Sequence, residues 1–240
     1  TDRTSGKYVG LWYLDPYART GKRSGAWANA YREHEMLDGE RTVLASNNSN
    51  FIQGAPGEPV LISWDDATTL FHEFGHALQA LSSKSVYPGL NGSVWDVVEF
   101  QSQLLERWLS TDEVTGKFLV HYKTGEPIPA ELVAKIKNAE TFNSGYSTTE
   151  YLASALVDLA FHEGDATADP MQKQAEVLAE IGMPHAIGMR HATPHFAHVF
   201  SGDHYSSGYY SYMWSEVMDA DAFAAFEEAG DPFDPEVAAR

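Results

Sequence analysis

Residues 72 to 76 read His-Glu-Phe-Gly-His, a combination that could bind a metal ion and use it for hydrolysis. Residues four apart lie on one side of a helix, so the imidazoles of His72 and His76 can reach a single tetrahedral ion. Glu73 points about a quarter-turn away, where it can act as general base on a water at the metal. A chance match on a surface helix is the alternative interpretation. The pattern predicts one Zn²⁺ per chain.

A catalytic zinc ion also needs a third protein ligand and a position left open for water. The segment that follows can supply the ligand, because Glu99, Gln103 and Glu106 recur at helical spacing beside an apolar stripe. We predict that Glu99 is the ligand, with Asp96 as its main competitor. Glu106 lies about two turns further on, where its carboxylate could accept the free ring N–H of a ligating histidine. A solvent-facing polar stripe is the alternative.

Residues 198 to 212 combine a Gly- and Ser-containing loop with many phenols, which could donate hydrogen bonds to an oxyanion formed from a peptide carbonyl. Tyr205, Tyr209 and Tyr212 are spaced like one face of a helix, and we predict that this face belongs to the site. Plain core packing of the tyrosines is the alternative. The opposite face is expected to be core and consists of Tyr210, Met213, Trp214 and Val217.

The helix that carries the two histidines should run from about Trp64 to Ser82. Ser63 and Asp66 form a capping box at its start, and apolar residues then recur at helical spacing. Gly75 lies inside this helix at a cost of about 1 kcal/mol relative to Ala, which the close approach of another segment would explain. Further helices are expected at about 97–108, 147–161, 169–182 and 207–228.

Residues 1–62 are rich in strand formers and turn residues, which predicts a small sheet. The expected pieces are strands at 8–14, 26–31 and 42–46, a turn at Asp15-Pro16, and a polar turn-like cluster at 47–50. Residues 63–240 should be mostly helical. We therefore expect one catalytic domain over residues 1–240 that is mainly α with a small β-sheet.

Composition restricts the classes of function. The 34 Asp and Glu residues against 16 Lys and Arg produce a formal charge of -18, which excludes nucleic acid and anionic membranes as partners. Without cysteine, any metal must be held by His and carboxylates. The absence of an apolar run of about 20 residues predicts a soluble protein, in the cytoplasm or alternatively the periplasm. The start at Thr1 rather than Met predicts a fragment.

Six motifs spread over nearly the whole chain resemble one family. They are Gly10–Tyr17, Lys22–Trp27, Ser46–Phe51, Trp64–His76, Val98–Phe100 and Phe196–Tyr212. The family is the thimet oligopeptidase family of zinc peptidases, and the resemblance is to its bacterial peptidyl-dipeptidase (dipeptidyl carboxypeptidase) branch. The loop Asn91–Asp96 departs from the family pattern, because it is shorter than usual and lacks an Arg.

The resemblance implies roles for individual residues. It identifies His72, His76 and Glu99 as zinc ligands, Glu73 as general base, and His198, Tyr209 and Tyr212 as oxyanion- and substrate-binding groups. Tyr205 is a further candidate for substrate binding. Arg190 is a candidate for contacting the C-terminal carboxylate of a peptide.

The family also implies an architecture and an activity. We expect the zincin-like catalytic portion of a larger helical peptidase, built on the HExxH helix and a downstream Glu helix. The expected activity is release of C-terminal dipeptides from short peptides. One alternative is an oligopeptidase that cleaves internal bonds. The other is a zinc-binding fragment, inactive without the missing N-terminal half, which is the expected protein partner.

Overall fold

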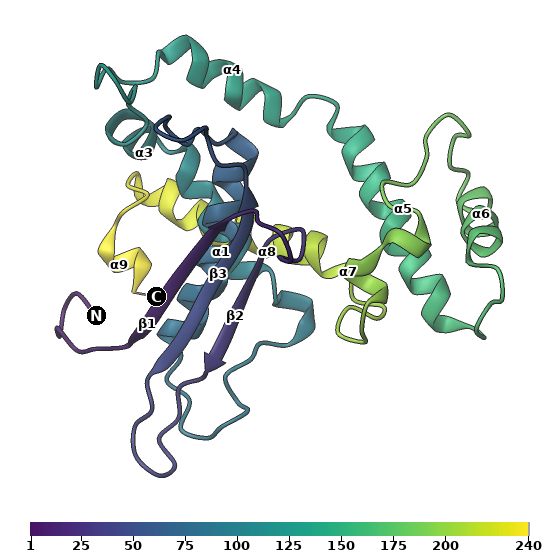
Figure 1. Ribbon diagram of the computed structural model, residues 1–240, viewed down its shortest axis with the longest axis horizontal. Helices are drawn as coiled ribbons and strands as arrows, with labels where there is room; N and C mark the ends of the chain where they lie inside the picture. Colours follow the sequence, from purple (N-terminus) through teal and green to yellow (C-terminus); the bar gives the residue numbers. More distant parts are fainter. Residues whose placement is uncertain (240) are drawn as a thin grey trace. The chain divides into compact units, whose positions relative to one another are not determined.

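The computed structural model describes residues 1–239, which form two compact units (Figure 1). The first unit contains residues 1–94, 98–127 and 215–239, and the second contains residues 95–97 and 128–214. Helices predominate and the strands form one three-stranded sheet, so the predicted mainly α fold with a small sheet is confirmed. The single catalytic domain expected over residues 1–240 stays a prediction.

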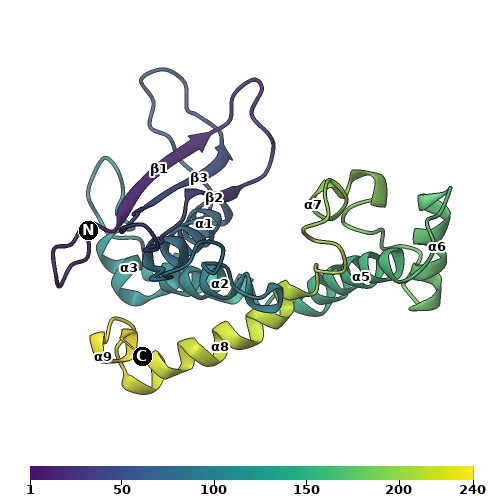
Figure 2. The ribbon, with the colours of Figure 1, turned by 90° about the horizontal axis from the view of Figure 1, so that it is seen from below.

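The sheet of the first unit has the order β1-β3-β2. Strand β1 (Gly10–Tyr17) runs parallel to β3 (Val43–Phe51), and β2 (Trp27–Arg32) runs antiparallel to it. The central strand β3 is buried along most of its length. Helix α1 (Trp64–Ser82) lies against one face of the sheet (Figure 2). The sheet thus supports the helix on which both predicted metal-binding histidines lie.

Two turns predicted in this region are wrong. Strand β1 continues through Asp15 and Pro16 with a shift of register before Tyr17, because an edge strand tolerates proline and a bulge. The polar cluster at 47–50 belongs to β3 instead of a turn, and Asn47 and Asn48 are buried. Both asparagines form side-chain hydrogen bonds there, which makes their burial tolerable.

Helix α1 has the predicted bounds, and Ser63 and Asp66 form the predicted capping box. Gly75 lies where another segment crosses, because a Cβ added there would be 2.5 Å from the carbonyl oxygen of Gln101. The crossing segment is α2 (Phe100–Glu106). The single helix expected at 97–108 is instead divided into η1 (Trp95–Val97), α2 and η2 (Arg107–Ser110).

The first unit also contains α3 (Asp112–Lys117), α9 (Pro235–Ala238) and most of α8 (Ser211–Ala229). Trp108 connects η2 to this C-terminal part of the chain. Its ring packs edge-on against Phe223 and Phe226, and its indole N–H donates to the carbonyl of Pro232 at 2.8 Å. The segment just after the predicted third ligand is therefore held by aromatic packing.

The second unit is helical. It comprises α4 (Ala130–Glu140), α5 (Ser144–Glu163), α6 (Pro170–Glu180), η3 (Thr193–His195), α7 (Ala197–Phe200) and the first turn of α8. Asp169 caps α6, as its position before Pro170 predicts. The buried Gln174 side chain accepts hydrogen bonds from the backbone N–H and hydroxyl of Thr193, which ties α6 to η3.

Within residues 1–239, every helix falls short of the length or apolarity needed to cross a bilayer. The cytoplasmic location expected from the sequence stays a prediction.

Candidate metal centre and tyrosine loop

Three predicted ligands come together in the first unit. Glu99 Oε2 lies 3.1 Å from His72 Nε2 and 3.1 Å from His76 Nε2. One nitrogen or oxygen atom from each side chain lies within 4.8 Å of those from the other two. The two imidazoles project from successive turns of α1, whereas Glu99 stands at the start of α2. Two helices therefore direct three donor atoms toward one point.

Further polar groups hold the donors in place. His72 turns its Nδ1 toward Glu106 Oε1 at 2.6 Å, so Nε2 is the nitrogen that faces Glu99. Glu99 is almost completely buried, and the hydroxyl of Ser102 donates to its backbone carbonyl at 2.8 Å and to its Oε2 at 3.2 Å. The position expected for Glu106, beside a ring nitrogen of a histidine, is the one observed.

The electrostatics of this cluster follow from burial and from charges in contact. Burial disfavours the charged form of His72, but the hydrogen bonds to Glu106 and Glu99 outweigh it and raise the pKa of His72 to about 10. Burial likewise opposes ionisation of Glu99, and the two histidines overcome it and hold the pKa of Glu99 well below its usual range. The cluster attracts positive charge, whether a proton or a metal ion.

Glu73 differs from the other acids of the cluster. Its side chain is buried, and its Oε2 has no hydrogen-bond partner among the described residues. Burial raises the pKa of Glu73, although the charges of His72 and His76 partly oppose the rise. A carboxylate with a raised pKa beside paired imidazoles has the properties of a general base.

Asp96 was the competing candidate for the third ligand. In the structure it accepts a hydrogen bond from the hydroxyl of Tyr210, and both residues belong to the second unit. Glu99 is the acid that lies with the histidines.

The tyrosines of the second unit lie in a different setting from the one expected. Helix α8 starts at Ser211, and residues 201–210 form bends and turns, with Ser207 in the left-handed region at φ 56°. The predicted helix start at Ser207 is therefore wrong. The expected core face is also wrong, because three of its four residues are exposed: Tyr210 (43%), Trp214 (57%) and Val217 (67%).

The predicted functional side chains in the tyrosine loop (residues 201–210) and in the helices on either side of it are nevertheless close together. His198 Nε2 lies 2.9 Å from the hydroxyl of Tyr212, and that hydroxyl lies 3.3 Å from the hydroxyl of Tyr205. The rings of His198 and Tyr205 are 4.1 Å apart, and those of Tyr209 and Tyr212 are 5.4 Å apart. The second unit thus presents a cluster of imidazole and phenol groups that can donate hydrogen bonds.

Comparison with known proteins shows the family of this chain. The model of peptidase family M3 matches residues 1–240. The chain belongs to peptidase family M3. The resemblance drawn from the sequence motifs is thereby confirmed, and the cluster of His72, His76 and Glu99 in the first unit is a candidate metal site.

Named M3 relatives are similar over nearly all of this chain. Dipeptidyl carboxypeptidase of Escherichia coli strain K12 is 37% identical over 94% of the chain, and oligopeptidase A of the same strain is 37% identical over 92%. Thimet-like oligopeptidase of Dictyostelium discoideum is 33% identical over 94%. The chain spans about a third (34%) of the length of each of these relatives.

Two residues of this M3 chain that support the tyrosine loop were missed in the sequence. The buried carboxylate of Asp158, on α5, accepts the backbone N–H groups of Ser207 and Tyr209 at 3.0 Å each. Tyr151, also on α5, donates its hydroxyl to the carbonyl of Tyr209 at 2.5 Å. An acid among the apolar residues of an amphipathic helix was the available signal, but its partners are about 50 residues away in the chain.

Arg190 is exposed in the second unit. It is near enough to Tyr209 to act on its ionisation: burial raises the pKa of Tyr209, and the charge of Arg190 partly counteracts the rise. The roles expected for Arg190 and for the tyrosines stay predictions.

Proposed function

We propose that this chain carries the catalytic zinc site of an M3 peptidase that hydrolyses short peptides and releases C-terminal dipeptides. The observation that carries the proposal is the position of Glu99 Oε2, 3.1 Å from the Nε2 atoms of both His72 and His76. Because the chain spans a third of its relatives' length, the activity of the whole protein is part of the proposal.

The donor set fits zinc. Ligands at about 2.0–2.2 Å from a tetrahedral zinc ion are about 3.3–3.6 Å from one another, slightly more than both His–Glu separations of 3.1 Å. Two imidazoles and one carboxylate, with no thiolate, are a recognised catalytic zinc set that leaves the fourth position open. When bound, zinc polarises the scissile carbonyl and lowers the pKa of water.

Glu73 is proposed to act as the general base. Its buried and unpartnered Oε2 can take a proton from the attacking water and later deliver it to the departing amine. The raised pKa of Glu73 supports both steps, because a pKa nearer to neutral pH lets the carboxyl group both take up and release a proton. Glu106 keeps the Nε2 of His72 directed at the metal by accepting the N–H of Nδ1.

His198, Tyr209 and Tyr212 are proposed to donate hydrogen bonds to the oxyanion and the substrate, with Tyr205 beside them. This assignment is supported by the family resemblance and by the hydrogen bond between His198 and Tyr212 inside the second unit. Removing one such donor typically costs about 10²–10³ in kcat. Tyr212→Phe should therefore lower kcat while zinc binding is retained.

The main test measures zinc stoichiometry and peptide cleavage on the same samples. Wild-type protein should bind one zinc ion, and Glu73→Gln should keep the zinc and lose turnover. Glu131→Gln, an exposed change on α4, is the control and should leave both unchanged. Loss of zinc in Glu73→Gln, or its full activity, would contradict the proposed role.

A pair of substrates separates dipeptide release from internal cleavage. The comparisons do not choose between the two activities, because a dipeptidyl carboxypeptidase and an oligopeptidase A are both 37% identical to this chain. Dipeptide release predicts hydrolysis of an N-blocked peptide with a free C-terminus and failure with its C-terminal amide. Arg190→Gln should then weaken hydrolysis of the peptide with a free C-terminus and leave hydrolysis of the amide unchanged. Equal cleavage of both peptides would favour the oligopeptidase. Zinc binding without hydrolysis, with activity restored by the N-terminal half, would favour the inactive fragment.

A further inference from the structure

We propose that Asn47, oriented by Trp12, is a positioning residue that fixes residue 73 of α1 against the sheet. The inference rests on the proposed function, because it concerns the general base of that reaction. Asn47 belongs to the polar cluster in the middle of β3, which the metal site does not use. It contacts the backbone of Glu73 and not its carboxylate.

The hydrogen bonds run from the edge strand through the central strand to the helix. Trp12 Nε1 on β1 donates to Asn47 Oδ1 at 2.6 Å, and Asn47 Nδ2 donates to the carbonyl oxygen of Glu73 at 2.5 Å. An indole N–H can only donate, so it determines which end of the amide is the oxygen. The amide N–H group is therefore directed at the helix.

Burial favours a single orientation of the Asn47 side-chain amide. The side chain of Asn47 is 0% exposed, so any amide group left unpaired would lack even water as a partner. Such a group costs about 1–3 kcal/mol, which favours the one arrangement in which both ends are bonded. An apolar residue could fill the same space but would allow α1 to slide or rotate on the sheet.

Two close backbone approaches also help to hold α1, and both lie at residues other than 73. At Gly75 the helix meets α2, where an added Cβ would be 2.5 Å from Ser102 Cα. Toward its C-terminal end the helix meets β1, where a Cβ added to Gly10 would be 2.7 Å from Leu81 Cδ2. These contacts set how closely α1 approaches its neighbours. Asn47 adds a hydrogen bond at the residue that bears the general base.

A carbonyl oxygen has two lone pairs, so Glu73 can accept from Asn47 in addition to the N–H of the helix. The contact therefore fixes the rotation and axial position of residue 73 without interrupting α1. Trp12 reinforces the same place, because its ring packs edge-on against Phe74 with centroids 4.9 Å apart. A displacement of 1 Å at a reacting group can cost about 10² in rate.

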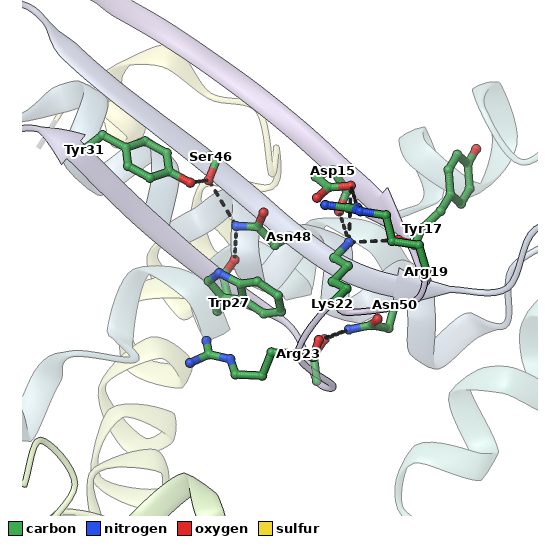
Figure 3. Close-up of polar contacts among 11 residues, drawn as sticks. Asp15, Tyr17, Arg19, Lys22, Arg23, Trp27, Tyr31, Ser46, Asn48 and Asn50 are labelled. Carbon is green, nitrogen blue, oxygen red and sulfur yellow. Dashed lines mark hydrogen bonds and ion pairs between the residues drawn. The ribbon is translucent and has the colours of Figure 1, made fainter. Parts of the chain in front are cut away.

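The neighbouring residue provides a matched control (Figure 3). Asn48 is also an asparagine of β3 and is also buried, but successive side chains point to opposite faces of a sheet. Its Nδ2 donates to the Ser46 hydroxyl at 3.0 Å and to the Trp27 carbonyl at 3.3 Å. The Ser46 hydroxyl also lies 3.0 Å from that of Tyr31. None of these partners belongs to the metal centre.

The first experiment compares Asn47→Leu with Asn48→Leu. We expect both to lower the unfolding temperature and to keep zinc. Only Asn47→Leu should lower kcat, by about 10- to 100-fold. Hydrogen exchange of the amides at 73–77 should accelerate in Asn47→Leu alone, a readout that is independent of catalysis. Equal effects of the two changes on kcat and exchange would overturn the inference.

A double variant separates positioning from stability and covers the case in which Asn47→Leu does not fold. Adding Trp12→Phe removes the indole N–H that Asn47→Leu leaves unpaired, and replacing both partners by apolar groups can be nearly neutral for stability. We expect the unfolding temperature to recover while kcat stays low. Recovery of kcat together with stability would show a structural role only. If wild-type protein binds zinc without cleaving peptides, the proposed function fails instead.

Discussion

The metal centre and the tyrosine loop hold their polar groups by different means. His72 and His76 are placed by the regular backbone of α1, and Glu99 meets them because Gly75 lets α2 approach closely. Residues 201–210 have no regular backbone, and the loop is anchored by hydrogen bonds from two of its N–H groups to Asp158. A helix tolerates the loss of one contact better than such a loop does.

Because of this difference, amino-acid substitutions should have different effects in the two regions. Substitutions of the three proposed ligands should act mainly on ion binding, because the backbone there is stabilised by helical hydrogen bonds and packing. Substitutions at the anchors of the tyrosine loop should act on the conformation of several tyrosines at once. The experiments below perturb the two regions separately.

The largest effect is expected from removing the third ligand. Glu99→Gln should abolish stoichiometric zinc binding, because a neutral amide replaces the one charged donor. Glu106→Gln should be milder, at about 10- to 100-fold in zinc affinity or activity, since Glu106 acts through His72. Competition with a chelator measures both. Equal zinc affinity of the two variants would contradict the assignment of Glu99.

The pH dependence of zinc binding should be steep. The pKa of His72 is about 10 without metal, so at neutral pH zinc must displace a proton from it, and affinity should rise about tenfold per pH unit for that proton. The metal-free protein should respond in the opposite direction. The contribution of His72 to the stability of the metal-free protein is complete below pH 6.5, the ordinary pKa of histidine. It is lost as the pH rises toward 10.

The pKa of Glu99 is lowered, so its contribution is present above its ordinary value of 4.5 and is lost on acidification. Calorimetry with and without zinc between pH 6 and 9 measures the gap between the two melting temperatures. The gap should widen with pH. A constant gap would show that no proton is displaced.

A smaller effect is expected at the anchor of the tyrosine loop. Asp158→Asn keeps the shape of the side chain but leaves one of two backbone N–H groups without an acceptor, which should cost about 1–3 kcal/mol of stability. Zinc affinity should be unchanged, and kcat should fall. Asp165→Asn, an exposed change just after α5, is the control. Weakened zinc binding in Asp158→Asn would show that the two regions are not independent.

The last comparison concerns stability alone, at two helical glycines. Gly75→Ala should destabilise by about 1–3 kcal/mol, because the new Cβ would meet the backbone of α2 and push it away. Gly145→Ala in α5 meets no atom within 4 Å and should stabilise by up to about 1 kcal/mol. Thermal unfolding measures both changes. A stable Gly75→Ala variant would mean that the crossing of α1 and α2 is adjustable.

Much of the first unit could be predicted from the residues themselves. The spacing of His72 and His76, the capping box at Ser63 and the midhelix Gly75 are local features, because a helix converts short sequence separations into fixed positions. Glu99 was predicted as the partner by its place at the start of the next polar stripe. Family motifs then indicated the zinc-peptidase fold, which the family comparison supports.

The tertiary structure alone decided the rest. The asparagines at 47 and 48 look like turn residues, but partners on other strands and on α1 make them stable in a buried strand. The tyrosines look helical, but Asp158, about 50 residues earlier in the chain, binds the backbone N–H groups of Ser207 and Tyr209 and so holds this segment in a loop. Local spacing determines structure where the backbone satisfies its own hydrogen bonds. Where distant side chains supply those bonds, only the folded chain reveals the arrangement.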